Sequence, residues 1–391
     1  MTVKIIESNK TCTGCFACYN TCPKSAIKME LIDGFYKPVI SQTACVSCGM
    51  CVSVCPQNSD VRITNYQTKA YACKNNDNAV RVKSSSGGVF TVLSESVLSE
   101  GGVVYGVAFD KQFLTHHIRV DSMIDMVKLR RSKYLQSYVG DVFKNIKRDM
   151  TEGRKVLFSG TPCQCAGLNA YLEGNRENLI IVEVLCHGVP SPVIWKNYLD
   201  YRVKKSKNSS RVENCMFRTK DACRSASWNN SYMYIKLDSE DYIVNSDSDP
   251  FMMLFARSDI ILNDSCYECR YRELVNRGFA DISLCDFWNI DRIAPSFNDG
   301  GGISLMMIHS QSGENLAEEC IKTMAVAEVE PQRALLLNSS SHQPKQINQN
   351  SKVRSSLIRF PAKFGRIYFT YLPVIYGRKV IDKIKKILKR Q

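Results

Sequence analysis

Four cysteines and a proline form a motif that occurs twice near the start of the chain, and this repeat restricts the fold more than any other feature. The spacing is Cys-x2-Cys-x2-Cys-x3-Cys-Pro, and the second copy follows the first by 33 residues. Such runs hold 4Fe–4S clusters through their thiolates, and in paired runs the fourth cysteine ligates the other cluster. The repeat therefore predicts two 4Fe–4S clusters, one held by Cys12, Cys15, Cys18 and Cys55 and the other by Cys45, Cys48, Cys51 and Cys22.

This repeat predicts a bacterial-type ferredoxin domain over residues 1–62. A zinc ribbon is the structural alternative, but its usual form is two CxxC pairs separated by about 15–20 residues. Three cysteines at successive two-residue gaps, with a fourth and a proline, do not suit that form. A ferredoxin domain carries electrons without further help. The rest of the chain is therefore expected to hold whatever the electrons come from or go to.

The composition favours a globular protein of two or three domains. Hydrophobic residues make up 44% of the 391 residues, which is enough to bury a sizeable core. No apolar run reaches the roughly 18–20 residues of a membrane-spanning helix. The first residues, MTVKIIESNK, lack the apolar stretch of a signal peptide. With 18 cysteines and no export signal, we expect metal–thiolate chemistry in the cytoplasm rather than a disulfide scaffold.

The net charge of +14 is concentrated in a tail. Residues 345–391 contain 13 basic residues and one acid, which accounts for +12 of the total. The body is nearly neutral, so we expect no nucleic-acid partner. Residues 380–391 predict a basic amphipathic helix, with lysines opposite an apolar stripe. This helix is expected either to dock peripherally on the anionic inner face of a membrane or to pack on the chain's own body or a partner subunit.

Between the ferredoxin domain and the tail, the pattern predicts an α/β region in two parts, residues 63–205 and 206–345. Buried apolar runs alternate with helical stretches such as 88–100, which favours a mixed sheet. The expected fold class is therefore α+β or α/β: a ferredoxin domain, a mixed α/β domain and a basic helical tail over 346–391. The predicted strands are 103–109, 155–160, 179–186, 231–237 and 301–309.

Three loops in the first part of this region suggest a ligand site. Residues 84–88 read Ser-Ser-Ser-Gly-Gly and precede a predicted helix. Small residues let a backbone approach a ligand, and free N–H groups at a helix start attract phosphate, although an ordinary helix cap is the alternative. The loops 161–164 and 186–190 each follow a predicted strand. Because ligands of open α/β sheets bind beyond the carboxyl ends of the strands, these two loops are expected to face one site.

Longer motifs occur in a fixed order between about residues 70 and 345. They are SSSGGVFT (84–91), GGVVYGVAF (101–109), LRRSKYLQS (129–137), VLFSGTPCQ (156–164), LCHGVPSP (185–192), FRTK (217–220), CYEC (266–269) and DISLCDFW (281–288). Together these motifs resemble the beta subunit of coenzyme F420 hydrogenase/dehydrogenase. The sequence departs from that family at Cys285 and Asn289, where glycines are expected around Asp-Phe-Trp. That departure puts the local loop, and with it the entry for a hydride partner, in question.

The resemblance implies an FAD-binding iron–sulfur flavoprotein. Lys133 and Arg130 would offset the pyrophosphate charge or favour the reduced anionic form of the flavin at its N1 edge. Lys133 and His187 are candidates for tuning the reduction potential of the site. The alternative for Lys133 and for Arg130 is an ordinary surface cation. The alternative for His187 is a hydrogen-bonded supporting histidine without catalytic duty. The residues expected to hold FAD are Ser84, Ser85, Ser86, Gly87, Gly88, Arg130, Ser132, Lys133, Tyr134, Gln136 and Thr161.

Four cysteines outside the repeat occupy the family's motif positions. Cys163 and Cys186 follow predicted strands, and Cys266 and Cys269 form a CxxC pair. All four are expected to converge on a third 4Fe–4S cluster beside the flavin, with a four-cysteine zinc site or buried free thiols as alternatives. Cys165 is expected to serve packing. The cysteines expected to be structural are Cys73, Cys215, Cys223, Cys285 and Cys320.

The expected function is that of a flavin-dependent oxidoreductase. FAD would exchange a hydride with a two-electron carrier or substrate, such as a deazaflavin, a nicotinamide or an unknown compound, and single electrons would pass through the clusters. No separate catalytic side chain is expected. Bacterial relatives often occur near surface-polysaccharide genes, which suggests a tie to polysaccharide synthesis. The alternatives are a non-enzymatic electron-transfer subunit and a scaffold of a membrane-associated glycan assembly.

Overall fold

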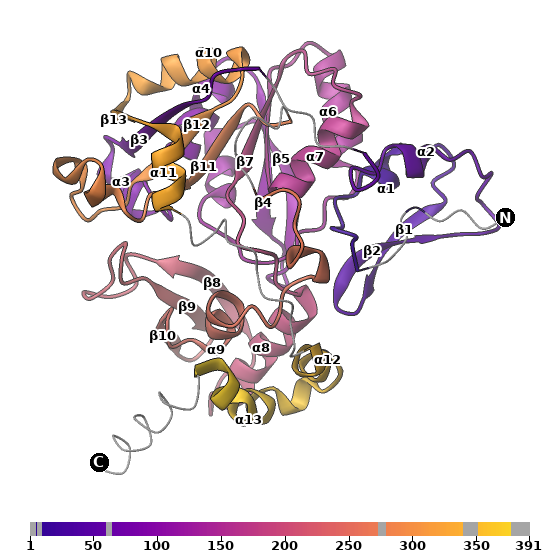
Figure 1. Ribbon diagram of the computed structural model, residues 1–391. Coiled ribbons are helices and arrows are strands. Elements are labelled where there is room, and N and C mark those ends of the chain that lie inside the picture. The colour runs from indigo at the N-terminus through magenta and orange to yellow at the C-terminus, as the bar shows by residue number, and fades with distance from the viewer. Residues whose placement is uncertain (1–4, 6–9, 60–64, 273–278, 339–350, 377–391) are drawn as a thin grey trace.

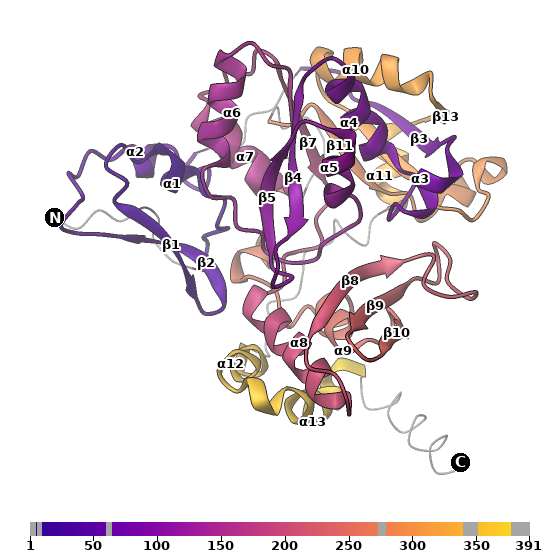
Figure 2. The same cartoon turned by 180° about the vertical axis from the view of Figure 1, so that it is seen from behind.

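The computed structural model describes residues 5, 10–59, 65–272, 279–338 and 351–376. A ferredoxin-like module lies at one side of an eight-stranded sheet with its helices, and a smaller unit built on a three-stranded sheet lies below them (Figure 1 and, from behind, Figure 2). The described chain is thus a mixed α/β protein with an N-terminal ferredoxin-like domain, as predicted.

The ferredoxin-like module consists of two short helices and a hairpin. Helices α1 (Ala17–Thr21) and α2 (Met50–Ser53) each carry the third cysteine of one repeat. Strand β1 (Ile27–Ile32) pairs antiparallel with β2 (Phe35–Ile40). We call the described chain outside this module the body. The buried ring of Phe16 meets Tyr138 of the body edge-on, with 4.9 Å between the ring centroids. Apolar packing therefore joins the module to the body.

The eight-stranded sheet combines parallel and antiparallel pairs. Its central neighbours β11 (Ile282–Asp286), β7 (Leu179–Val184), β6 (Val156–Gly160) and β4 (Val103–Phe109) are parallel, whereas the outer pairs are antiparallel. The three buried strands expected at 103–109, 155–160 and 179–186 are confirmed as β4, β6 and β7. In spatial order the strands are β13 (Met324–Val329), β3 (Lys69–Asn75), β12 (Ser304–Ile308), β11 (Ile282–Asp286), β7 (Leu179–Val184), β6 (Val156–Gly160), β4 (Val103–Phe109) and β5 (Thr115–Val120).

Helices cover both faces of this sheet, which is why its strands read as continuous apolar runs. One face packs against α4 (Val89–Ser99) and α10 (Gln311–Ile321). The other face packs against α6 (Val142–Thr151), α7 (Pro162–Tyr171) and, near β3 and β12, α11 (Pro331–Leu337). Two short helices, α3 (Asn78–Val82) and α5 (Met123–Met126), lie in the connections. Strands from both sides of residue 205 build this one sheet.

The smaller unit has its own core. Strands β8 (Val212–Thr219), β9 (Tyr232–Leu237) and β10 (Asp241–Asn245) form an antiparallel sheet. Trp195 of α8 (Pro192–Lys205) is fully buried there against Phe217 and Phe251, the latter in α9 (Pro250–Met252). Helices α12 (Ser351–Arg359) and α13 (Phe364–Tyr376) pack against α8 and close the same core.

The basic tail is helical over its described part. The amphipathic segment expected at 380–391 lies outside the described residues. Within the described ranges, none of the helices combines the length and apolar character needed to cross a bilayer.

Candidate iron–sulfur and flavin sites

Two cavities in the ferredoxin-like module are lined by the cysteines of the repeat. Each encloses about 360–370 Å³, counting its open side. Each cavity collects three cysteines of one run and the fourth of the other, which is the grouping that the spacing predicts. The inner cavity, nearer the body, is lined by Cys12, Cys15, Cys18 and Cys55. The outer cavity is lined by Cys22, Cys45, Cys48 and Cys51.

The thiols of the inner cavity are buried, and the burial has a chemical consequence. It raises the pKa of Cys15 to about 12, and the pKa values of Cys12 and Cys18 also lie above their usual range. A thiolate is favoured at such a site only when a positive partner such as iron stabilises it. The donor set therefore fits a metal cluster held by thiolates.

Four thiols outside the module also come together. Cys163 lies in the first turn of α7, Cys186 follows β7, Cys266 ends a short helical turn, and Cys269 comes three residues later. Cys163 and Cys186 each interact electrostatically with Cys266 and Cys269 and with one another. Burial raises the pKa of Cys186 to about 12 and that of Cys163 well above its usual value. We call these four residues the body thiol group.

The surroundings of the body thiol group also supply hydrogen bonds to sulfur. The backbone N–H of Val189 donates to Cys266 Sγ at 3.5 Å, and Thr161 Oγ1 lies 3.3 Å from Cys163 Sγ. His187 follows Cys186 directly, and its Nε2 lies 2.7 Å from Asp259 Oδ1. Across the described part of the chain, no three His, Cys, Asp or Glu side chains lie close enough to share a single metal ion.

Helix α7 brings the body thiol group against the inner ferredoxin cavity. Gly167 lies one turn after Cys163, and a Cβ atom there would sit 2.9 Å from Cys15 Sγ. Only glycine leaves room for this approach. Tyr271, two residues beyond Cys269 and 2% exposed, donates its hydroxyl to the carbonyl of Pro56 at 3.0 Å, next to Cys55. The body therefore contacts the inner cavity from two sides.

The serine–glycine loop meets the second predicted FAD segment. The N–H of Ser132 donates to Ser85 Oγ at 2.8 Å, and the two hydroxyls lie 3.0 Å apart. Gly88 caps α4 with a left-handed φ of 86° and has no side chain to occupy the N–H groups of the first turn. The structure thus brings the segments 84–88 and 130–134 together at the start of a helix.

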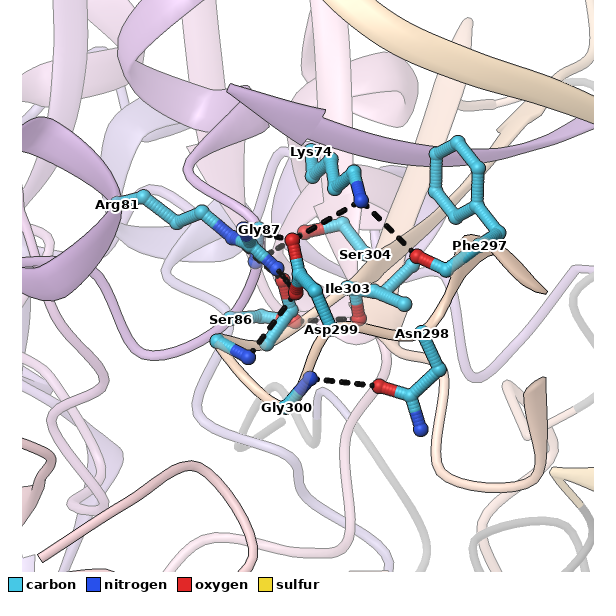
Figure 3. Close-up of polar contacts among 12 residues, drawn as sticks. Lys74, Arg81, Ser86, Gly87, Phe297, Asn298, Asp299, Gly300, Ile303 and Ser304 are labelled. Carbon is cyan, nitrogen blue, oxygen red and sulfur yellow. Dashed lines mark hydrogen bonds and ion pairs between the residues drawn. The ribbon is translucent and has the colours of Figure 1, made fainter. Parts of the chain in front are cut away.

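The rear of the loop is held by the start of β12 (Figure 3). Ser86 Oγ donates to the carbonyl of Ile303 at 2.7 Å, and the N–H of Gly87 donates to Ser304 Oγ at 3.0 Å. A Cβ on Gly87 would lie 2.3 Å from the Cys73 carbonyl oxygen. Glycine is therefore required at this position by backbone on both sides. Ser84 donates its hydroxyl to the carbonyl of Val80 in the preceding helix, α3, at 2.8 Å.

Cations behind the loop were not predicted from the sequence. Arg81, 7% exposed, pairs with Asp299, which also binds Lys74 at 2.9 Å (Figure 3). Lys220 Nζ donates to the carbonyls of Arg81, Ser86 and Gly301 at 2.7–2.9 Å. Burial, and then the charge of Arg81, lowers the pKa of Lys220 to about 8. Lys220 ends the motif FRTK, so the motif is visible in the sequence although the role of this lysine is not.

Arg130, Lys133 and Tyr134 lie in different surroundings. Arg130 Nε is buried and has no hydrogen-bond partner among the described residues. Lys133 instead donates to the carbonyls of Arg130 and Arg131 in its own loop, at 2.8 and 3.3 Å. Burial lowers the pKa of Lys133 to about 7. Tyr134 accepts a hydrogen bond from Arg218 at 3.1 Å. Among these three residues, Arg130 is the one that leaves a donor available for an anion.

Gln136 and Thr161 lie on the side of the thiols. Gln136 is 2% exposed, accepts from the N–H of Tyr36 at 2.7 Å and donates to the carbonyl of Thr13 at 3.2 Å. It therefore joins the ferredoxin-like module to the body. Thr161 forms a capping box with Gln164 at the start of α7. The structure thus places both residues with the iron–sulfur sites rather than with the serine–glycine loop.

We expect Gln136→Ala to loosen the docking of the module. The loss leaves the partly buried N–H of Tyr36 without its acceptor, at a cost of about 1 kcal/mol. Hydrogen exchange at Tyr36 and neighbouring amides should accelerate, whereas Gln311→Ala, which removes an exposed bond to Asn315, should change nothing. Unaltered exchange in Gln136→Ala would show that this contact does not hold the module.

The other cysteines lie within packed structure, apart from Cys223. Cys165 donates towards the carbonyl of Gly160 in the core. At the positions that depart from the family, Cys285 Sγ accepts from Asn338 at 3.3 Å and Asn289 donates to the carbonyl of Leu337. These bonds tie the Asp-Phe-Trp loop to the end of α11. The buried members are Cys73, Cys165, Cys215 and Cys320, and Cys223 and Cys285 are of intermediate burial.

Comparison with known proteins gives two family matches. Residues 153–333 match the family described as the C terminus of the coenzyme F420 hydrogenase/dehydrogenase beta subunit. Residues 11–59 match the 4Fe–4S dicluster domain. A chain of the xenon-derivatized F420-reducing NiFe hydrogenase complex from Methanosarcina barkeri is 16% identical, with a TM-score of 0.47, covering 73% of this chain and 92% of that one. No curated protein matches the chain.

Proposed function

Because residues 153–333 belong to the coenzyme F420 hydrogenase/dehydrogenase beta-subunit family and residues 11–59 form a 4Fe–4S dicluster domain, we propose that this protein is an iron–sulfur flavoprotein oxidoreductase. The observation that carries the proposal is the body thiol group set against the inner ferredoxin cavity by one turn of α7. Such an arrangement serves electron transfer between the two parts of the chain.

Cys163, Cys186, Cys266 and Cys269 would hold a third 4Fe–4S cluster. Burial raises the pKa values of the Cys163 and Cys186 thiols, so these two need a positive partner to ionise. The N–H of Val189 and the hydroxyl of Thr161 would stabilise negative charge on sulfur. Asp259 would orient the imidazole of His187 beside Cys186, where it tunes the site rather than moving a proton to substrate.

FAD would be held at the serine–glycine loop. Two features support this fit: the uncapped first turn of α4 and the unpartnered Nε of Arg130. Gly87 lets the loop pack closely against β3 and β12. Lys220 and the Arg81–Asp299 pair would keep the loop in place from behind. When bound, the flavin would exchange electron pairs with a carrier or substrate and single electrons with the protein's clusters.

The sites follow one another in space. The body thiol group adjoins the inner cavity, and the outer cavity carries the exposed Cys48. A second redox protein or partner subunit would therefore exchange single electrons at the outer cavity. The two-electron partner, whether a deazaflavin, a nicotinamide or another compound, would meet the protein near residues 84–88.

A non-enzymatic electron-transfer subunit is the second candidate. It is favoured by the internal bonds of Lys133 and Gln136, two of the residues expected to hold FAD. In that case the chain would carry iron–sulfur clusters and bind little flavin of its own.

The test is the content of iron, acid-labile sulfide and flavin in anaerobically purified protein. We expect about 12 iron atoms and about one FAD per chain. About 8 iron atoms without flavin would overturn both the third cluster and the flavin chemistry. About 12 iron atoms without flavin would favour the electron-transfer subunit.

A further inference from the structure

The helical segment at one end of the molecule carries exposed cations and exposed phenylalanines. Helices α12 and α13 lie at the end opposite α6 and α10 (Figures 1 and 2). Phe360 is 48% exposed and Phe369 57% exposed. Arg359, Lys363 and Arg366 are also exposed, and Lys363 Nζ lies 5.2 Å from the centroid of the Phe360 ring. We call these five residues the basic aromatic surface.

The inner faces of the two helices are firmly attached to the body. Arg354, buried, donates to the carbonyl of Leu262 and pairs with Asp264, both at 2.6 Å. Asn197 of α8 donates to the carbonyl of Leu357 at 2.8 Å. Phe364 and Tyr368 are buried in the core of the smaller unit. The basic aromatic surface is therefore carried by two helices that are packed on the body.

The charge of this surface has one sign. Residues 351–376 contain no Asp or Glu. The neighbouring end of α8 adds exposed Lys204 and Lys205, with Asp200 as the exposed acid on that helix. The sequence continues from α13 with seven more basic residues and one acid in residues 377–391.

We propose that the basic aromatic surface binds the anionic face of a lipid bilayer. Phenylalanine amid lysine and arginine on a helix is the composition of interfacial membrane helices. The absence of acids from residues 351–376 and the further basic residues that follow in the sequence favour an anionic surface as the occupant. Each cation near an anionic membrane is worth roughly fivefold in binding. The proposal is independent of the redox function and concerns where the protein works.

The test is cosedimentation of the full-length protein with vesicles. We expect binding to phosphatidylcholine vesicles that contain phosphatidylglycerol, weakened by salt, and little binding to pure phosphatidylcholine. The double variant Lys363→Glu, Arg366→Glu should bind more than about tenfold more weakly. The double variant Phe360→Ser, Phe369→Ser should bind several-fold more weakly at unchanged charge.

The matched control reverses two exposed lysines at the other end, Lys147→Glu with Lys322→Glu, and should bind anionic vesicles far more tightly than the first variant. Equal binding by all variants, or equal binding of wild type to both kinds of vesicle, would overturn the proposal. Iron and flavin are measured on the same samples. A failure of membrane binding is therefore distinguishable from a failure of the redox assignment.

Discussion

Cys163→Ala is expected to lower the iron content from about 12 to about 8 atoms per chain, with the ferredoxin clusters retained. The variant removes one of the four body thiols, and a 4Fe–4S cluster with three thiolates and no fourth ligand is readily lost. The measurement is iron and acid-labile sulfide, together with the electron paramagnetic resonance of the reduced protein. The signal from interaction between the third cluster and the inner ferredoxin cluster should disappear.

Cys165→Ala is the matched control, because Cys165 lies two residues further along α7 and its sulfur is buried in the core. It should keep its full iron content and lose only about 1 kcal/mol of stability. Cys186→Ala should repeat the loss seen for Cys163→Ala. If both of these ligand variants keep about 12 iron atoms, the body thiol group does not hold a cluster.

Gly87→Ala is expected to abolish flavin binding and to lower the free energy of unfolding by roughly 1–3 kcal/mol. The added Cβ would lie 2.3 Å from the Cys73 carbonyl oxygen and 2.8 Å from the Ser304 nitrogen. Both are backbone atoms of paired residues in β3 and β12, so neither can move away by a side-chain rotation. The strands or the loop must shift, and flavin titration and urea unfolding measure the two effects.

Gly106→Ala is the control for this substitution, because its nearest neighbour would be a methyl group of Leu129 at 3.1 Å. That methyl can move, so flavin affinity should stay near wild type. A Gly87→Ala variant that binds flavin as tightly as wild type would contradict the assignment of residues 84–88 to the flavin.

Local pattern was enough to predict the strands of the sheet centre. Strands β4, β6 and β7 are apolar at almost every position because helices cover both faces, and such runs are visible in the sequence. The order of the strands was not accessible in this way. Strand β3 lies between β12 and β13, more than 200 residues further along the chain, and no local signal records that pairing.

The same limit applies to the sites. The cysteine spacings predicted which thiols line each ferredoxin cavity, because cluster ligation restricts local spacing. Gln136 and Lys220 make their decisive bonds to backbone atoms distant in sequence. Every residue type has a backbone carbonyl, and all except proline have an N–H group, so a side chain that binds backbone leaves no pairing signal in a single sequence.

One turn of α7 separates Cys163 from Gly167, whose backbone touches Cys15. Electron tunnelling weakens steeply with distance, so small movements between two redox domains ordinarily make the rate fluctuate. Here the distance from Cys163 to Gly167 is one helical turn, about 5.4 Å, and backbone hydrogen bonds keep it constant. Gln136 and Tyr271 also hold the ferredoxin-like module against the body near this contact. If the body thiol group holds a cluster, its distance to the inner cavity would stay constant, and the rate of electron exchange across this step would stay steady.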